Sequence, residues 1–248
     1  MGRVEPLAAY RQRVNRGSDR PTRAALKNRY ELDPQGKAPG ASPKGVQGMS
    51  EVRGEGYRLI RGDCLEVLEA LKVEGVEVDA VITDPPYGIK IKSQNPFSNA
   101  KKLEVKTTSW DDVAPVQYLE SSLALLRPGG FFLAFTGQEF AGDLWNRAKE
   151  ADLKWVRWFY WIKTNPCPHA LPTYCNAVEV AVVGSKGGEK PVFNGGYASP
   201  NYFQTGLASG KERTAHPTQK NLDLMRKLIR DLVPEGGMVL DPFGGSGT

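Results

Sequence analysis

Hydrophobic and polar positions along the chain predict strands and helices in alternation. Runs of apolar and β-branched residues indicate strands, and apolar residues recurring every three to four positions indicate helices. The expected strands cover residues 57–61, 78–83, 131–136, 154–163, 177–184 and 238–240. The expected helices cover residues 64–72, 115–126, 139–151 and 219–233. This alternation favours right-handed crossovers, a mainly parallel α/β sheet and helices on both faces.

Three expected strands run into an aspartate, namely Asp63, Asp84 and Asp241. In a parallel α/β sheet, ligands bind at the carboxyl ends of the strands. We therefore expect the three carboxylates to face one crevice.

The composition agrees with a soluble α/β protein. The chain has 248 residues, of which 40% are hydrophobic and 25% charged, enough for one domain with a substantial core. No apolar run approaches the roughly 20 residues of a membrane helix, and no signal peptide is evident. These observations predict a cytoplasmic protein without a membrane partner.

Cysteine usage argues against a disulfide framework or a zinc site, because the chain has three cysteines and no C-x-x-C spacing. Cys167, His169 and Cys175 lie close enough in sequence to be imagined as ligands. We interpret them as ordinary loop residues and expect no metal.

The basic character of the chain resides in its first 50 residues. They hold ten Lys or Arg and four Asp or Glu, whereas the remainder holds 23 basic and 24 acidic residues. Residues 34–48 are rich in Gly, Pro, Lys and Ser, as in a linker. The arginines could contact phosphates, but we interpret residues 1–50 as a disordered basic arm and linker. The domain proper is expected over 51–248, with Met1 and Met49 both open as the natural start.

The segment Phe243-Gly244-Gly245-Ser246-Gly247-Thr248 follows an expected strand. Its glycines would let the backbone turn sharply and approach a ligand closely. Tight turns and chain termini have the same composition, so this run alone is weak evidence for a cofactor loop.

The segment Asp84-Pro85-Pro86-Tyr87 is more specific. Its two prolines remove backbone N–H donors, which leaves the Asp84 carboxylate and the backbone carbonyls as acceptors. Such a site suits a ligand that donates hydrogen bonds, for example an amino group, and Tyr87 offers a flat face on which a base could stack. The alternative is a rigid turn with Tyr87 in the core.

Together these motifs resemble those of the S-adenosylmethionine-dependent DNA amino-methyltransferases, which act on adenine N6 or cytosine N4. Asp84 to Tyr87 resembles their catalytic motif, and Asp241 to Thr248 resembles their cofactor loop. His216 to Lys220, Trp161 to Lys163, Glu179 to Lys186 and Gly62 to Cys64 resemble further segments of the family. Catalytic motif first and cofactor loop last is the order of the permuted β group, and the resemblance covers about residues 57–248.

The resemblance implies a Rossmann-like methyltransferase fold and a role for each matched position. Asp84 and the Pro85 carbonyl, in the motif that also contains Pro86, would accept hydrogen bonds from the target amine, and Tyr87 would stack on the extruded base. The implied cofactor-binding residues are Asp63, Thr218, Lys220, Asp241, Phe243, Gly244, Gly245 and Gly247. Among these, Asp63 would lie near the adenine end of the cofactor, and Thr218 and Lys220 would lie by its carboxylate. Residues 187–215 occupy the place of a short target-recognition segment.

The implied reaction moves a methyl group from S-adenosylmethionine to a base flipped out of double-stranded DNA, without a metal. Asp as the first motif residue favours adenine N6. Cytosine N4, an RNA or protein-glutamine substrate, and an inactive DNA-binding remnant remain open. In the family, a further helix and a strand ending in an acidic residue follow the cofactor loop, whereas this sequence stops at Thr248. We therefore expect a C-terminally incomplete sheet and weak cofactor binding.

Overall fold

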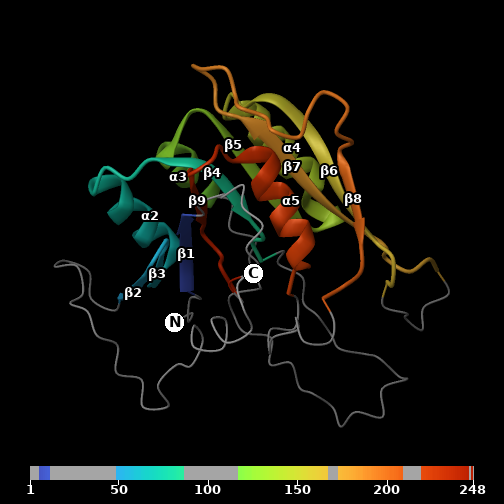
Figure 1. Ribbon diagram of the computed structural model, residues 1–248, viewed down its shortest axis with the longest axis horizontal. Helices are drawn as coiled ribbons and strands as arrows, with labels where there is room; N and C mark the ends of the chain where they lie inside the picture. The colour runs from blue at the N-terminus through green and yellow to red at the C-terminus, as the bar shows by residue number, and fades with distance from the viewer. Residues whose placement is uncertain are drawn as a thin grey trace, which may run out of the picture.

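The computed structural model describes residues 6–11, 49–86, 117–166, 173–208, 219–245 and 247. Their strands form one nine-stranded sheet in the order β2-β3-β1-β9-β4-β5-β7-β6-β8 (Figure 1). The strands are β1 (Pro6–Arg11), β2 (Ser50–Gly54), β3 (Tyr57–Arg61), β4 (Val78–Thr83), β5 (Leu126–Thr136), β6 (Lys154–Lys163), β7 (Val178–Ser185), β8 (Tyr202–Thr205) and β9 (Met238–Asp241). The helices are α2 (Cys64–Val73), α3 (Tyr118–Leu125), the 3₁₀ turn η1 (Gln138–Phe140), α4 (Ala141–Glu150) and α5 (Leu222–Leu232).

The predicted elements are present, with small differences at their ends. Strands β3, β4 and β6 have the predicted bounds, and β5 begins five residues earlier than expected, at Leu126. The stretch expected as one helix over 139–151 is divided between η1 and α4. Strands β1, β2 and β8 were not predicted.

The strand directions place one set of carboxyl ends at a single edge of the sheet. β4 is parallel to β5 and to β9, and β6 is parallel to β8. β1, β2 and β7 run antiparallel to their neighbours. Consequently β3, β4, β5, β6, β8 and β9 point the same way. The sheet is more mixed than expected, in part because the short turn at Glu55-Gly56 makes β2 and β3 an antiparallel hairpin.

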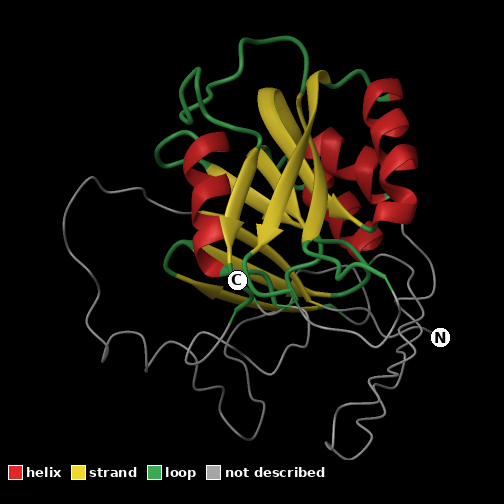
Figure 2. Ribbon diagram, turned by 90° about the vertical axis from the view of Figure 1, so that its right-hand side faces the viewer, coloured by secondary structure: helices red, strands yellow, loops and turns green. Residues whose placement is uncertain are grey.

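Helices cover both faces of the sheet, as predicted (Figure 2). On one face, apolar residues of α2, α3 and α4 pack on Val81, Phe132 and Val182. On the other face, α5 packs on alternate positions of the same strands, including Ala80 and Ile82 of β4. Burial of both faces explains why β4 is an almost continuous apolar run. Among the described residues, no helix is long and apolar enough to span a bilayer.

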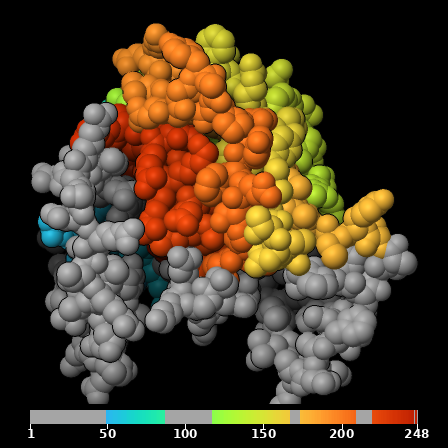
Figure 3. Space-filling model, turned by 45° about the vertical axis from the view of Figure 1, so that its right-hand side comes forward, coloured from blue at the N-terminus to red at the C-terminus, as the bar shows by residue number. Residues whose placement is uncertain are grey.

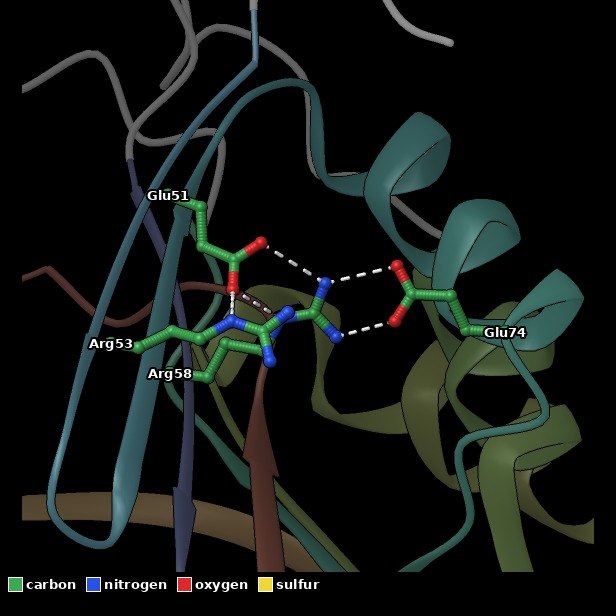
Figure 4. A network of polar contacts seen from close by, with 4 residues as sticks. All are labelled: Glu51, Arg53, Arg58 and Glu74. Atoms are coloured by element: carbon green, nitrogen blue, oxygen red, sulfur yellow. Dashed lines mark hydrogen bonds and ion pairs between the residues drawn. The ribbon is translucent and has the colours of Figure 1, made fainter. Parts of the chain in front are cut away.

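A network of charges holds the β2–β3 hairpin against α2 (Figure 4). Arg58 on β3 makes two hydrogen bonds to Glu74, of 2.5 and 2.9 Å, at the end of α2. It also bonds Glu51 on β2 at 2.9 and 3.2 Å, and Arg53 contacts the same Glu51 carboxylate. The hydrogen bonds from Arg58 lower the pKa of Glu74. One guanidinium thus joins both carboxylates.

Strand β1 differs from the interpretation of residues 1–50 as a disordered arm and linker. Pro6–Arg11 pairs antiparallel with β3 on one side and with β9 on the other, placing Ala8 opposite Asp241. An open strand edge presents unpaired N–H and C=O groups that favour the addition of another strand. The short run PLAAY supplies that strand, although it is too short to stand out in an otherwise polar region. Residues 12–48 lie outside the described residues.

Candidate active site

The acidic residues predicted to share a crevice stand at one edge of the sheet. Asp84 follows β4, Asp241 ends β9 and Asp63 follows β3, and these three strands run in the same direction. β7 runs the opposite way, so its first residues, including Glu179, lie at this edge as well. The common edge was predicted from the sequence; the contribution of β7 was not.

A hydrogen bond joins the ends of β4 and β9. The Thr83 hydroxyl donates to Asp241 Oδ1 at 2.6 Å, and the backbone N–H of Phe243 donates to the same oxygen at 3.0 Å. Burial raises the pKa of Asp241 to about 6, with nearby Asp84 adding to the rise and the two hydrogen bonds opposing it. Asp241 is therefore a half-buried carboxylate whose negative charge a cationic ligand would stabilise.

Lys220 lies between two carboxylates. Its Nζ forms an ion pair with Asp84 Oδ2 and a second ion pair with Glu179 Oε2 at 3.0 Å. Only 8% of the Lys220 side chain is exposed, and Nζ lies 5.1 Å from the centroid of the Phe135 ring. Burial alone would lower the pKa of Lys220, but the charges and hydrogen bonds of Asp84 and Glu179 outweigh it and raise the pKa. The ammonium therefore stays protonated at neutral pH.

Glu179 also pairs with a second lysine. Its Oε1 forms an ion pair with Lys163 Nζ at 2.8 Å, and Lys163 Nζ also lies 5.5 Å from the centroid of the Trp161 ring. Burial tends to raise the pKa of Glu179, but Lys220 and Lys163 overcome this and lower it. We call Lys163, Glu179, Lys220 and Asp84 the charge chain; along it, positive and negative groups alternate.

The two prolines after Asp84 leave this part of the site rich in acceptors. Pro85 is buried and Pro86 is half-buried. Neither has a backbone N–H, so the backbone of the two prolines contributes only carbonyl acceptors beside the Asp84 carboxylate. Tyr87, the expected stacking residue, lies outside the described residues.

The glycine-rich segment forms a tight turn directly after β9. The N–H of Gly247 donates to the carbonyl of Gly244 at 2.7 Å, and Gly245 and Gly247 have φ angles of 47° and 74°. Those backbone angles favour glycine. Phe243 packs edge-on against Tyr118, with ring centroids 5.2 Å apart. Ser246 and Thr248 lie outside the described residues.

These residues fit S-adenosylmethionine in part. The half-buried Asp241 suits a cationic sulfonium, and the glycines at Gly244–Gly247 directly after it would let backbone approach a ligand closely. Lys220 is less suited to the cofactor's carboxylate, because it is already engaged by two protein carboxylates. Thr218, its expected companion, lies outside the described residues.

Asp63 acts locally as the N-cap of α2. Its side chain accepts hydrogen bonds from the N–H groups of Leu65 at 2.9 Å and of Glu66 at 3.4 Å. Capping explains why aspartate stands at the start of this helix. A role at the adenine end of a cofactor stays a prediction.

The expected target-recognition segment, residues 187–215, is only partly at the active edge. β7 ends at Ser185, opposite Phe131 at the other edge of the sheet, so the chain leaves β7 far from Asp84. In Figure 3 the surface of this segment adjoins α5, to which Asn194 is tied by hydrogen bonds to the carbonyls of Arg230 and Val233. β8 then returns parallel to β6, placing Thr205 beside Lys163. Residues 209–215 lie outside the described residues.

No site role was predicted for Thr83, Tyr118, Lys163 or Glu179, although the segments that contain Lys163 and Glu179 were matched to the family. Glu179 carried a detectable signal, because it is a charged residue at the start of a buried apolar strand. Thr83 and Tyr118 are buried, and burial raises the pKa of Tyr118, as does nearby Asp84. Thr83 ends β4 and Tyr118 begins α3. Their proximity to Asp84 and Asp241 depends on how these elements pack, and one sequence does not reveal that.

The cysteines supply no evidence for a different chemistry. Burial raises the pKa of Cys64 to about 11, so its thiol is not an activated nucleophile. Cys175 is exposed, and Cys167 and His169 lie outside the described residues.

Comparison with known proteins identifies the family. A family model described as DNA methylase, covering the N6 and N4 enzymes, matches residues 78–248. The chain therefore belongs to the N6/N4 DNA methylase family, and its sheet is the Rossmann-like methyltransferase fold.

Two curated relatives share sequence over most of the chain. The type II methyltransferase M.HinfI of Haemophilus influenzae is 26% identical over 216 residues, which are 77% of this chain and 59% of the relative. The type II methyltransferase M2.LlaDCHI of Lactococcus lactis subsp. cremoris is 24% identical over 213 residues, 77% of each chain. The chain thus spans less than two thirds of M.HinfI.

A solved structure supports the same assignment. The crystal structure of the M1.HpyAVI-SAM complex is 28% identical and superposes with a TM-score of 0.57 over 75% of this chain and 82% of that one.

Proposed function

We propose that this protein is an S-adenosylmethionine-dependent DNA methyltransferase that modifies the exocyclic N6 of adenine. The observation that carries the proposal is the placement of Asp84-Pro85-Pro86, at the end of β4, beside Asp241 at the end of β9. The Thr83–Asp241 hydrogen bond of 2.6 Å joins these two strand ends. The proposed amine site and the proposed cofactor site would therefore share one edge of the sheet.

The residues on the target side would bind and orient the amine. The Asp84 carboxylate and the Pro85 carbonyl would accept hydrogen bonds from its two N–H groups. Because the amine lone pair is delocalised into the ring, such bonds favour a more tetrahedral and more nucleophilic nitrogen. A base within a duplex cannot reach this edge, so the target must be flipped out of double-stranded DNA.

On the cofactor side, the glycine turn and Asp241 would hold S-adenosylmethionine. Once bound, this cofactor supplies a positively charged sulfonium and therefore an activated methyl group. Asp241 would balance the positive charge, while the turn at Gly244–Gly247 would keep backbone close to the ligand. The protein's contribution is then mainly orientation and electrostatics.

Adenine is preferred over cytosine on the identity of the first motif residue, Asp84. A direct test incubates the full chain with unmethylated double-stranded DNA and saturating cofactor, and then analyses the nucleosides by mass spectrometry. The proposal expects N6-methyladenine. N4-methylcytosine would overturn the base assignment, and methylation of RNA or protein in place of DNA would overturn the substrate class.

A further inference from the structure

Lys220 directly precedes α5, and its backbone position is fixed by the start of that helix. Asn221 is the N-cap of α5 and accepts hydrogen bonds from the N–H groups of Asp223 at 2.9 Å and Leu224 at 3.2 Å. The capped helix packs its apolar side on the sheet. The Lys220 side chain therefore starts from a fixed point and extends towards the end of β4 and the start of β7.

The ammonium group of Lys220 is paired with two carboxylates of the protein, which a lysine that binds the carboxylate of a cofactor would not need. The Nζ atom forms ion pairs with Asp84 and with Glu179, and only 8% of the side chain is exposed. A buried ammonium is costly unless it is paired and hydrogen-bonded, and two carboxylates meet that requirement. The contact to Asp84 joins Lys220 to the residue proposed to hold the target amine.

We propose that Lys220 is a positioning residue for Asp84, and that Glu179 and Lys163 act through it. The inference rests on the proposed function, because it explains how the amine-binding carboxylate is held. It departs from the role that the family resemblance implies for Lys220, at the carboxylate of the cofactor.

The charge chain explains how such positioning works. An ionised carboxylate has about four lone-pair sites, and an ammonium bonded at Oδ2 uses one of them. Lys220 thus restrains the rotation of the Asp84 carboxylate while leaving it an acceptor. Glu179 holds the ammonium from the other side, and Lys163 neutralises the second Glu179 oxygen.

The test compares four variants of the full chain at saturating S-adenosylmethionine. Lys220→Met removes the ammonium that contacts Asp84. Glu179→Gln removes the other carboxylate that pairs with this ammonium, and Lys163→Met removes the last positive group of the charge chain. Lys227→Met is the matched control, because Lys227 forms an ion pair of 2.6 Å with Asp231 on α5 outside the charge chain.

We expect kcat for DNA methylation to fall about 100-fold in Lys220→Met, about tenfold in Glu179→Gln and less in Lys163→Met. The Kd for S-adenosylmethionine, measured by calorimetry without DNA, should change less than about threefold in Glu179→Gln. Lys227→Met should leave both quantities unchanged. A rise of about tenfold or more in the cofactor Kd of Lys220→Met, with kcat retained, would assign Lys220 to the cofactor and overturn the proposal.

A second measurement does not require turnover. A double-mutant cycle in the unfolding equilibrium compares Lys220→Met, Asp84→Asn and the double variant. We expect the two substitutions to be coupled by about tenfold or more in the unfolding constant. Additive effects would overturn the positioning role even if the wild-type chain methylates DNA. Strong coupling in a chain that methylates no DNA would instead contradict the proposed function while leaving the Lys220–Asp84 pair intact.

Discussion

Thr83 donates its hydroxyl hydrogen to Asp241 Oδ1 across 2.6 Å, so the residue before Asp84 on β4 is bonded to the last residue of β9. The two residues are 158 positions apart in the chain. Because both side chains stand at strand ends, this bond fixes the separation between the proposed amine-binding motif and the proposed cofactor-binding residues, which lie at the same edge of the sheet.

Replacing Thr83 with Val should therefore destabilise the protein. The substitution keeps the side-chain shape but removes one of the two hydrogen bonds to Oδ1 of the half-buried Asp241. We expect a loss of about 1–3 kcal/mol in the free energy of unfolding, measured by urea denaturation. Thr136→Val is the control, because Thr136 ends the neighbouring strand β5 and its side chain, within the described part of the chain, makes only a 3.3 Å bond to the adjacent Gly137 carbonyl. Equal losses in the free energy of unfolding of the two variants would show that the Thr83–Asp241 bond contributes no more than an ordinary threonine hydrogen bond.

Asp241 should make stability depend on pH. Its pKa is raised from 3.8 to about 6 by burial, so the folded state holds its proton more tightly than the unfolded state does. The resulting stability is present below about pH 4 and is lost as pH rises through about 6, by on the order of 2–3 kcal/mol.

The variant Asp241→Asn keeps an acceptor for Thr83 but cannot ionise. We expect it to have a higher Tm than the wild type at pH 7.5, and a much smaller advantage at pH 4.5. Thermal unfolding at the two pH values, followed by circular dichroism, provides the comparison. A variant less stable than the wild type at pH 7.5 would contradict the raised pKa of Asp241.

The same carboxylate should link cofactor affinity to pH. If a cationic ligand binds beside ionised Asp241, protonation at low pH competes with binding. We expect the affinity for S-adenosylmethionine to fall by about tenfold between pH 7.5 and pH 5. Asp241→Asn should bind weakly with little dependence on pH over this range. Calorimetry in buffers of matched ionic strength measures the affinity of both proteins. A wild-type affinity that is unchanged at pH 5 would show that the positive charge of the cofactor does not bind beside Asp241.

The hairpin network offers a test of the fold away from the active edge. Arg58 bonds both Glu51 and Glu74, and only 17% of its side chain is exposed, whereas 68% of the Arg53 side chain is exposed. We expect Arg58→Met to lower the free energy of unfolding by about 1–2 kcal/mol and Arg53→Met by less than about 0.5 kcal/mol. Chemical denaturation of the two variants measures the difference. If Arg53→Met were the more damaging, the hairpin would not be held through Arg58.

Sequence patterns predicted the central fold because the buried strands have strong local signals. β4 and β6 are marked by apolar runs, and α5 by apolar residues at helical spacing, so their bounds follow closely. β1 and β8 were missed because they are short and their partners are distant in the chain. Pairing with β9 and β6 stabilises them, and that contribution is absent from local patterns.

Several residues of the candidate site were predicted, but the contacts between their side chains were not. Asp84 and Asp241 were recognisable because each ends an apolar strand and begins a distinctive motif. The ion pairs of Lys220 with Asp84 and Glu179 could not be predicted, because they depend on Glu179 of β7 reaching the same edge. The order and direction of the strands determine whether Glu179 lies there. Because β7 is antiparallel to its neighbours, its first residues, rather than its last, lie at the site.

The most direct test of the central claim measures methylated bases in DNA. Wild-type protein and Asp84→Asn are incubated with unmethylated double-stranded DNA and isotopically labelled S-adenosylmethionine, and the nucleosides are separated by mass spectrometry. The account predicts labelled N6-methyladenine with the wild type and a loss of roughly 10²-fold or more with Asp84→Asn, although the variant still binds the cofactor. Equal labelling by the two proteins, or no labelled base with cofactor-bound wild type, would contradict it.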